Sequence, residues 1–154
     1  MTRFSLERSR IIHADLPTVW NVIADLDGYH QHTDTLTRTT VVSGAGEGAR
    51  RRCVDSAGND WEETCTVWEP EKRYVIDVDV STYPARFRAM FKEFRGTWSV
   101  GHTNDGTEVT VRFDAALRGI PGLSKLVDHL AERSGSDVEA ILESYDRAAT
   151  RNFT

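Results

Sequence analysis

Regular alternation of apolar and polar residues between Arg50 and Ala115 is the feature that most constrains how this chain folds. Successive side chains of a β-strand point to opposite faces, so alternation predicts strands with one packed face and one solvated face. Three turn sequences, at residues 55–60, 69–72 and 103–106, divide the stretch and are rich in Gly, Asn, Asp and Pro. The pattern therefore predicts a series of antiparallel hairpins.

Each turn fixes which residues of its two strands lie opposite each other, because a slip of one residue moves every side chain to the other face. Centring the first hairpin on residues 55–60 places Arg52 opposite Glu63. The same rule applied to all three turns gives the further expected pairs Arg50–Cys65, Val54–Trp61, Trp61–Val80, Glu63–Val78, Cys65–Ile76, Val67–Tyr74, Gly96–Phe113, Trp98–Val111 and Val100–Val109. A slip would bury Asp77 and Asp79, which favours this register.

In this register one face of the sheet is apolar apart from a few groups, chiefly Arg52 and Glu63. Its expected apolar members are Val54, Trp61, Cys65, Val67, Tyr74, Ile76, Val78, Val80, Phe94, Trp98, Val100, Val109, Val111 and Phe113. Arg51 is expected on the polar face. Cys53 and Cys65 fall on opposite faces, so no disulfide is expected. A polar pair inside an apolar concavity is the most informative candidate site in the sequence.

The length and composition of the chain exclude several classes of protein. We expect one domain over residues 1–154, because this length is enough for one complete core. A net charge of −5 argues against a nucleic-acid partner, and no apolar run approaches the roughly 20 residues of a membrane helix. The first residues lack the apolar segment of a signal peptide, so a cytoplasmic protein is expected. No Cys/His cluster has metal-binding spacing, and neither a metal nor a cofactor is expected.

The N-terminal part of the chain predicts a strand followed by two short helices. Residues 3–13 are expected to form the strand, and Asp15 can cap a helix that carries Pro17 in its first turn. Gly28 ends this helix or begins a second short one over residues 29–32.

A long helix is predicted after six further strands that end near Leu117. From Pro121 onward, apolar residues recur at helical spacing. They are Leu123, Leu126, Val127, Leu130, Val138, Ile141, Leu142 and Tyr145. The weak helix formers Ser134, Gly135 and Ser136 predict a kink in this helix or room beside it.

Several short motifs occur in an order that resembles a known fold family. They are IIHADLPTVW at residues 11–20, DL at 25–26, GAGEG at 44–48, WEP at 68–70, GTW at 96–98 and GT at 106–107. With them the whole chain resembles the helix-grip fold of the START/Bet v 1-like (SRPBCC) superfamily, and within it the bacterial polyketide cyclase/dehydrase-like group. The resemblance implies an α+β fold in which a curved antiparallel sheet of about seven strands surrounds a long C-terminal helix, in the order β-α-α-β6-α. The chain departs from the family at Asp15, where many relatives carry Pro, and at residues 30–32, where relatives often carry Trp and Pro.

Three residues are the candidate catalytic groups. Glu63 would transfer protons, while Arg52 and Tyr74 would stabilise developing oxyanions. The alternative for Arg52 and Glu63 is a purely structural ion pair, and for Tyr74 a core residue with a satisfied hydroxyl. The alternative bases are His30, His32 and His129, which follow the first helices or lie beside the apolar stripe of the long helix.

The candidate substrate-binding residues come from the apolar face, the following irregular segment and the long helix. They are Trp61, Ile76, Val78, Phe87, Met90, Trp98, Val111, Phe113, Leu130 and Ser134. Alternation breaks within residues 81–93, which predicts either an irregular start to a strand or a flap with a basic rim. Such a rim would suit an acidic ligand or the phosphopantetheine of a carrier. The glycines at 44, 46 and 48 lack the strand-to-helix context of a phosphate loop, so a strand connection is expected there.

Two functional classes follow from the resemblance and the expected cavity. The first is a cofactor-independent enzyme of the cyclase, aromatase or dehydratase type, which folds a hydrophobic aromatic or polyketide-derived molecule in the cavity. The second is a non-catalytic binding or carrier protein for a hydrophobic small molecule or lipid. The expected partners are this ligand and an acyl carrier protein, with the chain a monomer or homodimer. Neither nucleic acid nor membrane is expected as a partner.

Overall fold

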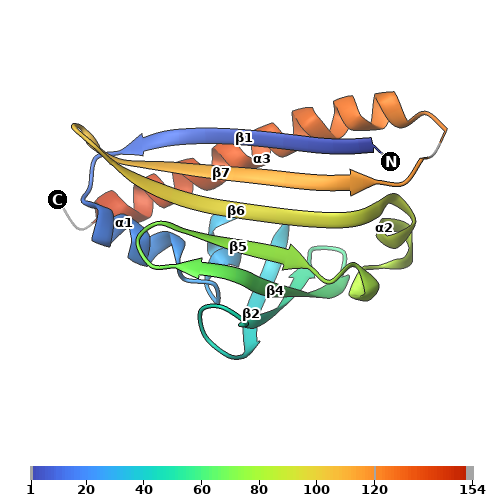
Figure 1. The fold of residues 1–154 in the computed structure, drawn as a ribbon, viewed down its shortest axis with the longest axis horizontal. Coiled ribbons are helices and arrows are strands. Elements are labelled where there is room, and N and C mark those ends of the chain that lie inside the picture. The colour runs from blue at the N-terminus through green and yellow to red at the C-terminus, as the bar shows by residue number, and fades with distance from the viewer. Residues whose placement is uncertain (1, 120, 152–154) are drawn as a thin grey trace.

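The expected hairpins form one seven-stranded antiparallel sheet in the computed structural model, which describes residues 2–119 and 121–151. The strands are β1 (Thr2–Ile12), β2 (Leu36–Ser43), β3 (Arg50–Asp55), β4 (Asp60–Glu69), β5 (Arg73–Val78), β6 (Phe91–Thr103) and β7 (Gly106–Leu117). Their spatial order is β1-β7-β6-β5-β4-β3-β2, and the sheet curves around a long helix (Figure 1). This arrangement confirms the predicted α+β helix-grip fold.

Within residues 2–119 and 121–151, five helical segments accompany the sheet. They are α1 (Leu16–Ile23), η1 (Tyr29–His32), η2 (Val80–Thr82), α2 (Ala85–Met90) and α3 (Leu123–Thr150). The predicted cap of α1 is confirmed, because the Asp15 carboxylate accepts a hydrogen bond of 2.9 Å from the Thr18 amide. No helix among the described residues is long and apolar enough to cross a membrane.

The long helix α3 is continuous through Gly135, where the sequence predicted a kink or extra room. Gly135 is buried, and a Cβ there would lie 3.1 Å from Arg8 on β1, so the glycine allows close packing of α3 on β1. Fully buried residues of α3 occur only from Gly135 onward; they are Gly135, Val138, Ile141, Leu142, Tyr145 and Ala149. The first half of α3 is therefore less tightly covered than the second half.

The predicted register is confirmed for the β6–β7 hairpin and for part of the β4–β5 hairpin. The confirmed pairs are Gly96–Phe113, Trp98–Val111, Val100–Val109, Glu63–Val78 and Cys65–Ile76. The pair Val67–Tyr74 was wrong, because a β-bulge after Cys65 pairs Trp68 with Tyr74 instead. The bulge brings Trp68 against Trp20, with a ring-centroid separation of 5.4 Å.

The predicted register of the β3–β4 hairpin was wrong by one residue. Arg51, not Arg52, lies opposite Glu63, and Cys53 lies opposite Trp61. The turn explains the shift: the Asp55 amide donates to the Asn59 carbonyl at 2.9 Å, so Asp55 faces Asn59 and not Asp60. The Asp55 carboxylate also accepts hydrogen bonds from two amides of the loop.

The corrected register exchanges the two faces of β3. Arg51 and Cys53 are buried on the inner face, whereas Arg52 is exposed and Val54 only half-buried. Cys53 and Cys65 therefore lie on the same side of the sheet, contrary to the prediction, and both are free thiols. The expected strand pairing of Val80 was also wrong, because the chain leaves the sheet after Val78 and forms η2 and then α2 before β6 begins.

Candidate functional site

A cavity of about 210 Å³ lies between the inner face of the sheet, η1 and α3. We call it the inner cavity. The residues that line it are Tyr29, Thr35, Leu36, Arg51, Trp61, Glu63, Ile76, Val78, Tyr83, Phe94, Gly96, Trp98, Phe113, Ser134 and Asp137. Most of these side chains are aromatic or aliphatic, and a few converging polar groups stand among them. A concave, mainly apolar site of this kind is typical of small-molecule binding.

A larger hollow of about 710 Å³ continues from the inner cavity past α2. We call it the vestibule. It shares Thr35, Trp61, Tyr83, Phe94, Ser134 and Asp137 with the inner cavity. The other residues that line it are Asp34, Asp55, Ser56, Ala57, Arg86, Phe87, Met90, Phe91, Leu130 and Arg133. The segment after β5 forms the two short helices η2 and α2, and Tyr83 with three residues of α2 forms one wall of this hollow.

Arg51 and Glu63 form a buried ion pair on the wall of the inner cavity. Their side chains are only 4% and 9% exposed, and the Arg51 Nη2–Glu63 Oε1 distance is 2.5 Å. Arg51 also donates through Nε to the same carboxylate oxygen at 3.2 Å and through Nη1 to the Leu26 carbonyl at 3.1 Å. Its guanidinium lies 4.9 Å from the centre of the Tyr29 ring, a cation–π distance.

The electrostatics of this pair keep Arg51 charged. Burial lowers the pKa of Arg51 and is the largest single effect, but the charge of Glu63, its hydrogen bond and the nearby Cys53 and Tyr74 together outweigh burial, so the pKa is raised. Both Glu63 oxygens are occupied, because Oε1 accepts from Arg51 and Oε2 accepts from Trp61 Nε1 at 2.9 Å. Glu63 therefore serves as the counter-ion of Arg51, and Arg51 uses three of the five N–H groups of a guanidinium in these hydrogen bonds.

Two of the three predicted catalytic residues lie outside the inner cavity. Arg52 is exposed and pairs with Asp60 on the outer face. Arg51 occupies the inner position that was expected for Arg52, because the loop pairs Asp55 with Asn59 and shifts the register by one residue. Tyr74 is buried, and its hydroxyl donates to the Ile23 carbonyl at 2.5 Å. Burial raises the pKa of Tyr74, so this side chain is a neutral, satisfied core residue.

The predicted substrate-binding residues divide between the two hollows. Trp61, Ile76, Val78, Trp98, Phe113 and Ser134 line the inner cavity. Phe87, Met90 and Leu130 line the vestibule. Val111 lines neither hollow, because it is fully buried in the layer beneath.

Asp137 is a polar residue of the cavity that the sequence reasoning missed. It is half-buried on α3 and borders the inner cavity, the vestibule and a small side hollow of about 130 Å³. Within the described part of the chain it makes no hydrogen bond or ion pair. Burial raises the pKa of Asp137, which Arg133 opposes and Asp34 reinforces. Its position three residues after Ser134 on the helix was the available signal.

The three histidines considered as alternative bases do not line the inner cavity. His30 Nδ1 lies 2.9 Å from the Thr39 hydroxyl, and His32 Nδ1 lies 2.8 Å from the Ser144 hydroxyl. His129 is exposed on α3. Among the described residues no group of three His, Cys, Asp or Glu side chains is placed to hold a metal ion.

The antiparallel sheet and the long helix, with a cavity between them, define the helix-grip class of fold. The sequence pattern of the family described as "Polyketide cyclase / dehydrase and lipid transport" matches residues 3–150, and the chain belongs to this family. A search of curated protein sequences gives no significant match.

Solved structures of several aromatase/cyclases and related proteins are similar. The di-domain aromatase/cyclase StfQ of the steffimycin pathway has a TM-score of 0.78 and 11% identity, over 98% of this chain and 52% of that one. This chain thus spans about half of that protein. The Zhui aromatase/cyclase from a Streptomyces species has a TM-score of 0.77 and 16% identity, over 99% and 97%. Norcoclaurine synthase from Thalictrum flavum has a TM-score of 0.77 and 10% identity, over 99% and 98%. At these identities the similarity shows the shared fold.

Proposed function

We propose that this protein binds a hydrophobic, aromatic or polyketide-derived molecule in the inner cavity and assists its cyclisation or dehydration. One observation carries the proposal. The charged guanidinium of Arg51 and the Asp137 carboxyl, whose pKa is raised and which makes no hydrogen bond or ion pair among the described residues, both border one aromatic-lined cavity. Cyclisation by aldol addition needs a group that stabilises an enolate oxygen and a group that moves a proton.

The two residues take complementary roles in this scheme. The Asp137 carboxylate removes a proton from a methylene carbon of the substrate, and the positive charge of the Arg51 guanidinium stabilises the enolate oxygen that forms. The enolate carbon then attacks a carbonyl carbon of the same chain, and Asp137 returns its proton to the new alkoxide. In a dehydration, the regenerated Asp137 carboxylate removes a second proton from carbon and gives it to the departing hydroxide, which leaves as water.

Glu63 serves Arg51 as a counter-ion in this proposal, in place of the proton-transfer role first considered. Its oxygens already accept hydrogen bonds from Arg51 and from the Trp61 indole. The aromatic walls hold the chain in a folded conformation. Oriented intramolecular reactions gain on the order of 7–11 kcal/mol from positioning, so much of the rate would come from the shape of the cavity.

We also propose that the substrate is delivered by an acyl carrier protein. Residues 82–92 and 115–127 contain five basic residues and no acidic residue. The two segments are joined where the Arg118 guanidinium donates to the Arg88 carbonyl at 3.0 Å, beside α2 and the vestibule. A basic surface near the entrance suits an acidic partner.

A non-catalytic carrier of a hydrophobic molecule or lipid is the second candidate. The observation that favours it is the buried Arg51–Glu63 pair, which can orient a ligand without transferring a proton. The family description also includes lipid transport.

Replacement of Asp137 by Asn tests which candidate is correct. With a poly-β-ketone thioester analogue as the substrate, Asp137→Asn should lower turnover by about 10²–10⁴ and leave its affinity, followed by tryptophan fluorescence, within a few fold. Asp34→Asn, a change of the neighbouring vestibule carboxylate, is the matched control and should keep most of the activity. Binding without turnover by the unaltered protein would support the carrier function instead.

A further inference from the structure

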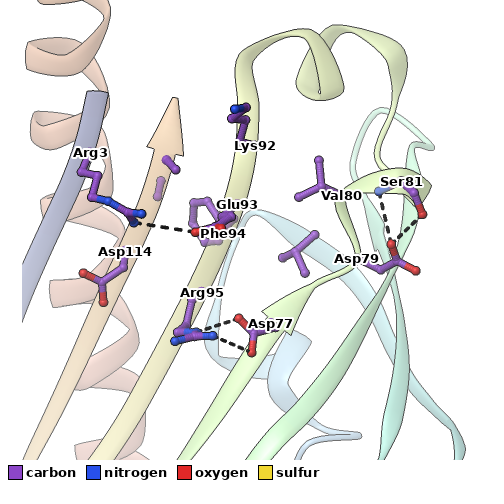
Figure 2. A pocket seen from close by; sticks show the side chains of 13 residues that line it. Arg3, Asp77, Asp79, Val80, Ser81, Lys92, Glu93, Phe94, Arg95 and Asp114 are labelled. Carbon is purple, nitrogen blue, oxygen red and sulfur yellow. Dashed lines mark hydrogen bonds and ion pairs between the residues drawn. The ribbon is translucent and has the colours of Figure 1, made fainter. Parts of the chain in front are cut away.

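Another hollow, of about 570 Å³, lies on the outer side of the sheet, where β5 and β6 separate (Figure 2). We call it the outer groove. Its charged and polar lining residues are Arg3, Asp77, Asp79, Ser81, Lys92, Glu93, Arg95 and Asp114. Its apolar lining residues are Val78, Val80, Phe94, Ala115 and Ala116. The outer groove is thus much more polar than the inner cavity.

The outer groove exists because two neighbouring strands stop pairing. Asp77 and Arg95 form the last pair between β5 and β6, and the Arg95 guanidinium bonds both Asp77 oxygens, at 2.7 and 3.3 Å. Beyond this pair β5 ends at Val78 and the chain turns into η2, whereas β6 extends back to Phe91. Figure 2 shows the ion pair at one end of the hollow and Val80 across from Phe94.

Two residues border both the outer groove and the inner cavity. Val78 and Phe94 line both hollows, and Phe94 also lines the vestibule. Both are half-buried. The Phe94 ring is held by contacts with Phe91 and Phe113, at centroid separations of 5.7 and 5.6 Å. In the described residues no β5–β6 ladder pair spans this level of the sheet, so Val78 and Phe94 lie where the hydrogen-bonded ladder between the two strands has ended.

We propose that this opening is a second entrance to the inner cavity, that Phe94 gates it, and that it passes water and other small polar molecules. An apolar ligand gains little from contact with the charged groups of the outer groove, whereas the aromatic walls of the vestibule offer it apolar contacts. The apolar ligand therefore enters through the vestibule, and the outer groove is left to small polar molecules. Rotation of a single ring, Phe94, joins the two hollows. The inference concerns access to the cavity and holds whether the bound molecule is transformed or only carried.

Acrylamide quenching of Trp61 fluorescence tests the proposal, because acrylamide is small and polar and Trp61 borders the inner cavity. Phe94→Ala should raise the quenching constant roughly twofold, since a second route adds to the first. The matched control is Phe113→Ala, which enlarges the inner cavity without opening the outer groove. Trp61→Phe in the Phe94→Ala background should remove most of the increase, because Trp61 is the more exposed of the two tryptophans that line the inner cavity.

Two labelled variants establish which route acrylamide takes. Lys92→Cys and Arg133→Cys place a bulky maleimide over the outer groove and the vestibule, respectively, and the native cysteines are buried. The label at position 92 should abolish the increase caused by Phe94→Ala, and the label at position 133 should leave it. The opposite result overturns the proposal, as does an unchanged quenching constant. If Phe94→Ala fails to fold, Phe94→Leu decides by the same criteria.

Discussion

Arg51 keeps a full positive charge in a place where an unpaired charge would be strongly unfavourable. It does so because Glu63, the Leu26 carbonyl and the face of Tyr29 surround its guanidinium. The same arrangement commits Glu63 to Arg51 and leaves Asp137 as a free carboxyl of the cavity. At the scale of single residues, the site therefore consists of one buried ion pair and one carboxyl that makes no hydrogen bond among the described residues.

Replacement of Arg51 should show how strongly the stability of the protein depends on the buried Arg51–Glu63 pair. Arg51→Met leaves the Glu63 carboxylate buried without its partner, so the free energy of unfolding should fall by roughly 3–5 kcal/mol, and Arg51→Met with Glu63→Met should recover much of the loss. Arg52→Met is the control and should change stability by less than about 0.5 kcal/mol, because its ion pair is exposed. Urea unfolding of the four proteins measures this. A larger loss for Arg52→Met would contradict the corrected register.

Gly96 shapes the floor of the cavity. A Cβ at this position would lie 2.5 Å from Cζ3 of Trp98, whose ring stacks on Tyr74 at 5.1 Å and has little room to move. Gly96→Ala should therefore destabilise the protein by about 1–3 kcal/mol, as overpacking does. Gly101→Ala in the same strand meets no atom within 4 Å and should be close to neutral. Equal thermal melts for the two variants would show that Trp98 moves freely.

At the scale of elements, the sequence correctly predicted which residues of a strand face the core where the pattern and the turn were compatible with a single register. In the β6–β7 hairpin a slip would have reversed an obvious alternation, and the predicted register is confirmed. In β3 the run Arg50–Arg52 offers a charge at every position, so alternation could not discriminate between registers. The hydrogen bonds of Asp55 with its own loop fixed the register instead. The sequence thus correctly predicted an arginine–glutamate ion pair on the inner face, but it assigned Arg52 in place of Arg51.

The contact between η1 and α3 predicts a dependence of stability on pH. Burial lowers the pKa of His32, whose ring packs 4.7 Å from Tyr145 and bonds Ser144. Since the folded protein disfavours the protonated ring, its contribution is present above the ordinary pKa of about 6.5 and is lost as pH falls below that value. Between pH 7 and pH 5 the melting temperature of His32→Gln should fall less than that of the unaltered protein. An exposed control, His102→Gln, should follow the unaltered protein.

At the scale of the whole molecule, the cavity joins residues that are far apart in the sequence. Arg51 comes from β3 and Asp137 from α3, and only the wrapping of the sheet around the helix brings both to one hollow (Figure 1). The order of elements was readable from local patterns, because caps, turns and periodicity are local signals. Asp137 was not, because its role depends on which part of α3 the sheet leaves uncovered.

The distribution of charge predicts how a carrier protein would associate. Residues 82–92 and 115–127 hold five basic residues, while the rest of the chain holds 14 of the 19 basic and all 24 acidic residues, a net charge of −10. We call these two segments the basic end, and an acidic carrier protein should be steered toward it by electrostatic attraction. The association rate should therefore fall as added salt shortens the Debye length from about 30 Å at 0.01 M to about 8 Å at 0.15 M. Lys92→Glu and Lys125→Glu should slow association and weaken its salt dependence, measured by stopped-flow fluorescence.

Arg38→Glu, on the edge strand β2, is the control for this prediction. It makes the same change of charge away from the basic end and should affect the association rate less. Equal effects of all three reversals would mean that the net charge of the chain, and not the basic end, governs the encounter.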